Sequence, residues 1–314
     1  MAVPVIQTQQ LSKVFSTKTR EIRALDNLSL TVNQGEIFGY LGPNGAGKTT
    51  TIRLLLDIIR PTTGHAQILG QDTHTNSVEL HRHIGFLPGE LNLWKSLTGK
   101  QVIHYIGQLR GGVDMTYVNR LAQQLEFDTS LRVRNYSTGN KRKLGLIIAM
   151  MNQPQLLILD EPTSGLDPLM QQTFNQLMRE VRNEGRTVFL SSHVLSEVQA
   201  ICDRVGILRN GQLKAVERVT DLTHAKFRWV TLRFKETVPA ISELESLAGI
   251  SDVTQENHSL RLRLIGDFDP LLHALQPYYV ADMRVEEPTL EEIFLAFYGN
   301  TTADHNLPQK EVVS

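Results

Sequence analysis

The sequence predicts an α/β fold that is interrupted by a block of helices and followed by a small α+β domain. Three observations lead to this prediction. Short apolar runs alternate with helical patterns over the first two-thirds of the 314-residue chain, residues 91–151 have helical spacing without a clear strand, and the pattern changes after Thr223. A chain of this length is also typical of two domains.

The α/β part contains three short apolar runs that are typical of strands buried on both faces, at residues 36–41, 156–159 and 187–190. A glycine-rich turn and a helical pattern over residues 48–59 follow the first run, and Pro61 ends that helix. After the second run, a helix begins at Asp167 and Pro168 and ends at Gly185. This alternation predicts the α/β core.

The block at residues 91–151 is expected to be a helical insertion in that core, because residues 101–109 and 117–125 carry apolar side chains at helical spacing. The longest unbroken apolar run, residues 146–151, is far shorter than the roughly 20 residues that a membrane-spanning helix needs. It therefore predicts a buried helix, and any role at a membrane would come through a partner.

Beyond Thr223 the expected order is strand 227–234, a helix near Pro239 capped by Thr237, a hairpin that turns at Glu256 and Asn257, a helix from Asp269, and strand 279–285. This βαββαβ order predicts a split βαβ sandwich. A capping box at residues 289–292 predicts a further helix through Phe297. We expect a first domain at 1–222 with a helical subdomain at about 91–151, a small domain at 223–299 and a flexible tail at 300–314.

Composition excludes several classes of function. The chain has 32 lysines and arginines and 33 aspartates and glutamates, a formal net charge of -1, which argues against a general polyanion binder. Its one cysteine, Cys202, excludes an internal disulfide and is typical of a reducing compartment.

Residues 42–49, GPNGAGKT, match the pattern G-x-x-x-x-G-K-[ST] between a predicted strand and a predicted helix. The glycines let backbone N–H groups turn inward around phosphate oxygens, and the helix N-terminus adds positive charge. We expect Lys48 to reach the β- and γ-phosphates and Thr49 to give a hydroxyl to Mg²⁺. A glycine-rich turn without a ligand is the alternative. The candidate phosphate-binding residues are Gly42, Pro43, Asn44, Gly45, Ala46, Gly47, Lys48, Thr49 and Thr50.

Two carboxylates, Asp160 and Glu161, follow the second buried run. Asp160 is a candidate Mg²⁺ ligand opposite Thr49, and Glu161 could deprotonate an attacking water. An ordinary solvated strand end is the alternative. His193 follows the third run, where it could bind the γ-phosphate. A capping or core histidine is the alternative, and it is the more frequent case for a single histidine.

Together these residues resemble the nucleotide-binding subunits of ATP-binding cassette transporters, over roughly residues 3–222. Tyr136-Ser137-Thr138-Gly139-Asn140 occupies the place of the family's L-S-G-G-Q signature and opens a helix. Residues 164–167 resemble its D-loop, His193 its switch histidine, and Phe15 its adenine-stacking aromatic, with a core aromatic as the alternative for Phe15. Five motifs in the family's order are more specific than any one motif.

The resemblance implies a P-loop NTPase (RecA-like) core that hydrolyses ATP with Mg²⁺, with Lys48, Glu161 and His193 as catalytic residues. It also implies a head-to-tail dimer, in which Ser137, Thr138, Gly139, Asn140 and Asp167 serve the ATP of the second copy. A separate membrane-spanning permease subunit is the implied partner, contacted near residues 89–100, where Trp94 and Leu97 are candidates for contact or for core packing. The subunit would then lie peripherally on the cytoplasmic face of the membrane, and no nucleic acid is expected.

The sequence departs from the family at two places. Gly89 stands where the family has glutamine, so no side chain there can touch Mg²⁺ or water, and the neighbouring Glu90 might substitute. Thr138 and Asn140 replace a glycine and a glutamine of the signature, but backbone donors survive such changes. The ending at residues 287–294 resembles that of drug and antibiotic exporters, although a capped amphipathic helix on the small domain would have the same pattern.

Two other functions stay open at this point. One is a soluble cassette protein that acts on ribosomes or nucleic acid, which the single cassette and the neutral charge disfavour. The other is a nucleotide-binding regulator without turnover, for which the two acids would be incidental.

Overall fold

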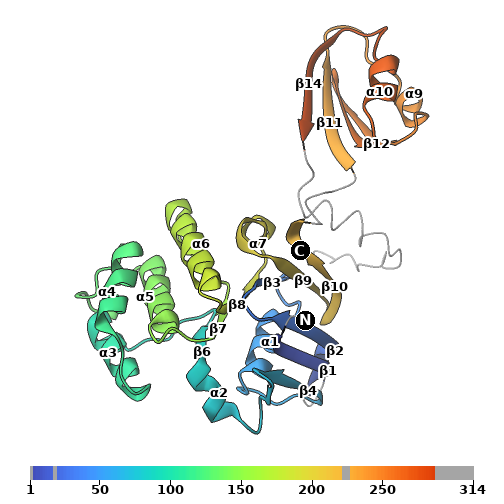
Figure 1. Ribbon diagram of the computed structural model, residues 1–314. Coiled ribbons are helices and arrows are strands. Elements are labelled where there is room, and N and C mark those ends of the chain that lie inside the picture. Colours follow the sequence, from blue (N-terminus) through green and yellow to red (C-terminus); the bar gives the residue numbers. More distant parts are fainter. Residues whose placement is uncertain (1–2, 17–19, 221–226, 287–314) are drawn as a thin grey trace, which may run out of the picture. The chain divides into compact units, whose positions relative to one another are not determined.

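The computed structural model describes residues 3–16, 20–220 and 227–286 (Figure 1). The chain divides into two compact units, Met1–Val219 and Thr220–Ser314. The boundary expected from the sequence lies after residue 222. The helix expected through Phe297, the exporter-like ending at 287–294 and the tail at 300–314 lie outside the described residues.

A six-stranded sheet forms the centre of the first unit, with the order β10-β9-β3-β8-β7-β6. Its strands are β3 (Ile37–Leu41), β6 (Ile84–Leu87), β7 (Leu156–Asp160), β8 (Thr187–Ser192), β9 (Arg204–Arg209) and β10 (Gln212–Arg218). Neighbouring strands from β9 to β6 are parallel, and β10 is antiparallel to β9. β3, β7 and β8 are buried along their whole length, which confirms the three predicted strands.

A second sheet, with the order β2-β1-β4-β5, is antiparallel and was not predicted. It contains β1 (Pro4–Ser16), β2 (Glu21–Asn33), β4 (Thr63–Ile68) and β5 (Gln71–Asp72). The pairing of β1 with β2 shifts register at several points, so the buried side chains of β1 do not alternate regularly with exposed ones. Buried side chains of this sheet share one core with β3 and with α1 (Lys48–Leu55).

The helices of the first unit that follow α1 are α2 (Ser77–His83), α3 (Gly99–Leu109), α4 (Met115–Gln124), α5 (Thr138–Met150), α6 (Pro168–Asn183) and α7 (Leu195–Ile201). A short 3-10 helix, η1 (Val133–Asn135), precedes α5. Figure 1 shows α3, α4 and α5, in green, side by side at one flank of this unit. Among the described residues, no helix has the length and apolar character that crossing a bilayer requires.

The expected end of the first helix was wrong. The predicted helix extends to residue 59, whereas α1 ends at Leu55. Asp57 has a φ of 55°, in the left-handed region, so the helix cannot continue through it. The Arg60-Pro61 stop signal therefore lies after a turn, not at the end of the helix.

The second unit is a four-stranded antiparallel sheet with the order β12-β13-β11-β14. Its elements are β11 (Phe227–Phe234), α9 (Ile241–Glu245), β12 (Ile250–Glu256), β13 (Ser259–Ile265), α10 (Asp269–Ala274) and β14 (Val280–Glu286), which confirms the βαββαβ order. The predicted cap was wrong: Ala240, not Thr237, precedes the first turn of α9. This unit has a core of its own around Val230, Leu232 and Leu262.

Gly85 lies where β6 packs closely against α5, so a substitution there tests this contact. A Cβ atom at this position would overlap the backbone carbonyl oxygen of Ala149 and would lie 2.7 Å from Leu157 Cδ2. We therefore expect Gly85→Ala to lower the free energy of unfolding by about 1–3 kcal/mol, measured by urea denaturation. Glu90→Ala is the control, because Glu90 is exposed in the loop that follows β6 and its truncation leaves this packing unchanged. Equal stability of Gly85→Ala and the native chain would contradict this packing.

Candidate functional site

The loop that contains Gly42 to Thr50 joins the carboxyl end of β3 to the start of α1. Gly47 precedes the helix with a φ of 111°, and a Cβ there would lie 2.5 Å from the carbonyl oxygen of Ala24. Only glycine fits this position without strain. Among the described residues, no side chain caps α1, so the amides of its first turn are available to an anionic ligand.

Lys48 lies inside this loop with its side chain almost fully buried. Its ammonium donates to the carbonyl oxygens of Gly42, at 2.5 Å, and Pro43, at 3.4 Å, and forms an ion pair with Glu161 Oε1 at 3.3 Å. These contacts hold a cation at the centre of the phosphate-binding loop.

Asp160 is the last residue of β7, and its side chain is 3% exposed. Thr49 Oγ1 donates to Asp160 Oδ2 at 2.9 Å, and Ser191 Oγ donates to Asp160 Oδ1. A hydroxyl and a carboxylate oxygen therefore lie together beside the phosphate loop. These are the hard oxygen ligands that Mg²⁺ prefers, and it usually binds one or two protein oxygens together with substrate phosphates.

Glu161 turns sharply out of the strand, with a φ of 49°. Its amide donates to the hydroxyl and the carbonyl oxygen of Ser191, at 3.1 Å and 3.2 Å. Its carboxylate lies between Lys48 and His193, whose Nδ1 is 2.7 Å from Glu161 Oε2. His193 is 48% exposed, so it is not a core histidine. The structure thus brings Lys48, Thr49, Asp160, Glu161 and His193 together at one edge of the sheet.

Gly89 lies just beyond β6 and faces Asp160. A Cβ at this position would be 3.2 Å from Asp160 Oδ2, so the backbone of this loop, and not a side chain, approaches the carboxylate. The neighbouring Glu90 is exposed.

The signature residues, Ser137 to Asn140, lie at the start of α5 in the helical insertion. Ser137 is the N-cap of α5 and accepts a hydrogen bond from the amide of Asn140. Ser137, Thr138, Gly139 and Asn140 line an open hollow of about 410 Å³ together with Lys143, Gly165, Leu166 and Asp167. Asp167 also caps α6 through the amide of Met170, at 3.0 Å. None of the described residues 42–50 lines this hollow.

Phe15 and Trp94 are aromatic side chains outside the core. Phe15 is 40% exposed near the end of β1, with Lys13 Nζ 5.1 Å from its ring, which excludes the core alternative for Phe15. Trp94 is 49% exposed and packs edge-on against Tyr105, with 5.2 Å between the ring centroids. Leu97 is half-buried.

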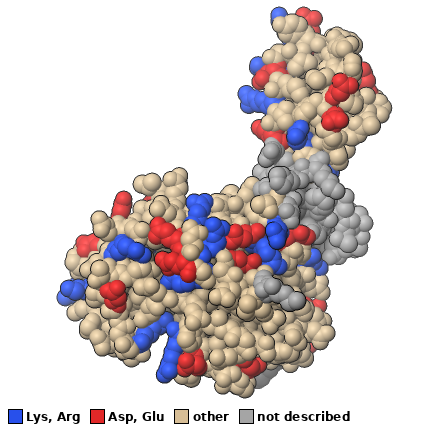
Figure 2. All heavy atoms as spheres, in the orientation of Figure 1, with Lys and Arg blue, Asp and Glu red and all other residues tan. Residues whose placement is uncertain are grey.

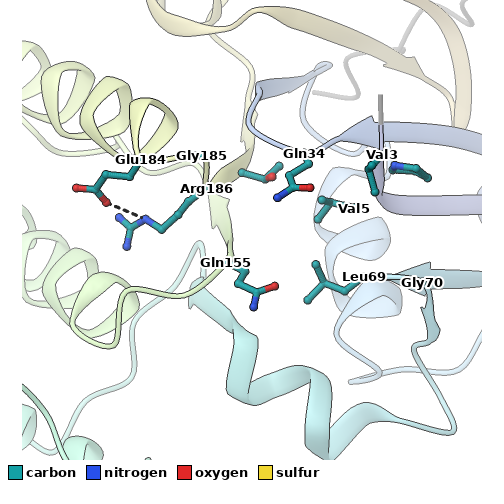
Figure 3. Close-up of a pocket in the computed structure, with 11 residues that line it drawn as sticks. Val3, Val5, Gln34, Leu69, Gly70, Gln155, Glu184, Gly185 and Arg186 are labelled. Carbon is teal, nitrogen blue, oxygen red and sulfur yellow. Dashed lines mark ion pairs between the residues drawn. The ribbon is translucent and has the colours of Figure 1, made fainter. Parts of the chain in front are cut away.

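A cavity of about 580 Å³ lies at the opposite, amino end of the parallel strands (Figure 3). Thr187, the first residue of β8, and Gln155, which precedes β7, are among its lining residues. Figure 3 shows Val5 and Leu69 on one side and the Glu184–Arg186 ion pair on the other. Ligands of open α/β sheets bind at the carboxyl ends of strands, so this cavity is not the candidate site.

Two residues of the site were not assigned roles from the sequence. Ser191 binds the carboxylate of Asp160 and the amide of Glu161. Its position at the end of a strand was the sequence feature that could have identified it. Arg142 of α5 is 6% exposed, and its guanidinium donates to Pro88 and Gly89. Burial lowers the pKa of Arg142, while the nearby carboxylates of Asp160 and Glu161 act to raise it. No sequence signal singled out Arg142, because it stands between Lys141 and Lys143 and resembles one of a run of surface charges.

Acidic and basic side chains are interspersed on the face of the first unit that Figure 2 shows. This mixture agrees with the net charge of -1.

Comparisons of the sequence and of the structure with known proteins identify the same family. The family described as ABC transporter matches residues 25–164. A bacitracin transport ATP-binding protein of Bacillus licheniformis is 36% identical, over 95% of this chain and 98% of that protein. A linearmycin resistance ATP-binding protein of Bacillus subtilis (strain 168) is 29% identical, over 96% of this chain and 100% of that protein.

Solved structures are similar over about two-thirds of the chain. The ATP-binding subunit of an ABC transporter has a TM-score of 0.63 and 28% identity, covering 69% of this chain and 91% of that one. A bacterial Atm1-family ABC exporter with ATP bound has a TM-score of 0.61 and 27% identity, covering 70% of this chain and 40% of that one.

Proposed function

The chain belongs to the ATP-binding subunits of ABC transporters and is an ATPase, and from this premise we propose that it powers export through a separate membrane-spanning permease. The observation that carries the proposal is the meeting of Lys48, Thr49, Asp160 and Glu161 at one sheet edge, apart from the signature hollow. Export is supported by the relatives, whose names describe bacitracin transport and linearmycin resistance.

We propose that two copies dock head to tail, so that each ATP lies between the phosphate loop of one copy and the signature hollow of the other. A change from mostly open to mostly closed needs about 5.5 kcal/mol of differential binding. Hydrogen bonds to charged groups contribute about 1.5–3 kcal/mol each, so a few bonds from Ser137 and the Gly139 amide to two γ-phosphates are sufficient.

In the proposed reaction Glu161 accepts a proton from the attacking water, and Lys48 neutralises charge on the phosphates. His193, hydrogen-bonded to Glu161, orients that carboxylate and contacts the γ-phosphate. Thr49 and Asp160 would hold Mg²⁺, which neutralises negative charge on the phosphates when it is bound. Phe15 is the candidate for stacking on adenine.

The permease is proposed to contact the segment around residues 89–100. The exposed Trp94–Tyr105 pair and Leu97 offer apolar side chains there. The subunit would accordingly lie peripherally on the cytoplasmic face of the membrane. Recovery with membranes, lost when the permease is absent, distinguishes this function from that of a soluble cassette protein on ribosomes or nucleic acid.

Glu161→Gln tests the catalytic proposal. Without a base, phosphate release is expected to fall about 10²–10⁴-fold, while Mg-ATP still binds. Because ATP then persists, the variant should sediment as a dimer in saturating Mg-ATP. Glu245→Gln, in the second unit, is the control and should behave as the native chain. Unchanged turnover would remove Glu161 from this role, and a monomer, even beside the permease, would contradict the dimer.

A second substitution in the Glu161→Gln background tests the signature hollow. Ser137→Arg fills the hollow with a bulky cation, so the double variant should bind Mg-ATP with unchanged affinity but remain monomeric in light scattering. Ser130→Arg, at an exposed serine of the helical insertion, is the matched control and should leave the dimer intact. A dimer that persists with Arg at 137 would place the interface elsewhere.

We propose that the second unit stabilises or regulates the dimer, since its described residues have their own core and no group of three or more His, Cys, Asp or Glu side chains that could hold a metal ion. Deleting all residues after Leu222 is then expected to weaken the ATP-bound dimer about tenfold, measured by analytical ultracentrifugation. Removing only residues 300–314 is the control. An unaltered dimer and an unaltered ATPase rate would contradict the proposal.

A further inference from the structure

Arg142 is a buried cation in the first unit that forms no ion pair within the described part of the chain. All its hydrogen bonds go to backbone carbonyl oxygens. Nη1 donates to Pro88 at 2.8 Å, Nη2 to Gly89 at 3.0 Å, and Nε contacts Ser164 at 3.5 Å. Arginine is almost never fully buried without a specific partner, and here the three carbonyl oxygens are the partners that compensate its burial.

The carbonyls belong to the two loops that flank the acidic pair. Pro88 and Gly89 follow β6, and Gly89 lies directly against the carboxylate of Asp160. Ser164 is three residues after Glu161, with its amide bonded to the Glu161 carbonyl oxygen at 3.2 Å. Arg142 thus fastens both loops to one helix.

That helix also carries the signature. Ser137 caps α5, and Arg142 follows it in the same continuous helix, Thr138–Met150. A helix of this length moves as a rigid body, so a displacement at its first turn moves the Arg142 guanidinium as well. The D-loop meets the signature directly too, because a Cβ on Gly139 would lie 2.9 Å from the Gly165 carbonyl oxygen.

We propose that Arg142 is a positioning residue that couples the signature turn of one copy to the acidic pair of the same copy. This inference rests on the proposed head-to-tail dimer. When the signature closes on the ATP bound by the second copy, α5 carries the carbonyls of Pro88, Gly89 and Ser164 with it. Asp160 and Glu161 then reach their working positions only in a closed dimer, which makes hydrolysis at one site depend on ATP at the other.

The chemistry of the position favours arginine. A guanidinium has a planar fork of N–H donors that can hold three carbonyls at once, whereas a lysine ammonium is a compact point charge. Gly89 has no side chain with which to make this connection, so the link between helix and loop passes through the backbone.

Arg142→Met tests the proposal in the full-length chain. Binding of Mg-ATP to the monomer should be unchanged, because the phosphate loop is intact. The kcat for phosphate release should fall about 100-fold through misplacement of the acids. The Hill coefficient for ATP should fall from about 2 to about 1. Arg142→Lys should give an intermediate loss, and it serves as the test variant if the methionine variant does not fold.

Arg110→Met is the matched control. Arg110, an exposed arginine of the helical insertion, also binds a backbone carbonyl: its Nη1 donates to the oxygen of Ile84 at 3.1 Å, at the other end of β6. Its loss should lower the melting temperature but leave kcat and the Hill coefficient as in the native chain.

Native kcat and cooperativity in Arg142→Met would overturn the proposal, as would an equal loss in Arg110→Met, which would show a merely structural role. Full activity of Arg142→Lys would overturn the requirement for the fork. A native chain that forms no ATP-dependent dimer and hydrolyses ATP without cooperativity would instead refute the dimer on which the inference rests.

Discussion

The buried carboxylate of Asp160 is the group on which the arrangement of the site depends. A charge that is 3% exposed must be hydrogen-bonded, and its partners come from separate elements. Thr49 of α1 and Ser191 of β8 donate to it. The backbone of Gly89, in the loop after β6, packs against it. One carboxylate therefore connects the phosphate loop to the ends of β7 and β8, because moving either Thr49 or Ser191 would remove one of two hydrogen bonds from a buried charge.

Glu161 shows how this constraint shapes the rest of the candidate site. Directly after Asp160 the backbone enters the left-handed region, which costs about 1–3 kcal/mol for such a residue and persists only where the surroundings hold it. Ser191 holds it here, through two hydrogen bonds to the Glu161 amide. The turn places the carboxylate between Lys48 and His193 instead of in line with the strand. Strain at this point is therefore offset by the same serine that holds Asp160.

The parts of the fold that could be predicted are those in which local pattern and burial agree. β3, β7 and β8 are apolar on both faces, so their runs are continuous and unambiguous. The N-terminal sheet could not be predicted because irregular pairing of β1 with β2 breaks the alternation on which such a prediction depends. The proposed role of Arg142 could not be predicted for another reason. Within Lys141-Arg142-Lys143 it reads as surface charge, and its partners at Pro88 and Gly89 lie more than 50 residues away in sequence.

The contacts of Arg142 also suggest how this chain accommodates a glycine where its family has glutamine. Connections made by a side chain are lost when that side chain is lost, but carbonyl oxygens are present at every residue. Because Arg142 binds the backbone at Pro88 and Gly89, the tie between α5 and this loop does not depend on the side chain at position 89. Gly89 in turn lets the loop lie against Asp160, because a Cβ at this position would be only 3.2 Å from the carboxylate oxygen. The glycine and the arginine are thus complementary: one brings the loop close to the acid, and the other supplies the connection that the glycine cannot make.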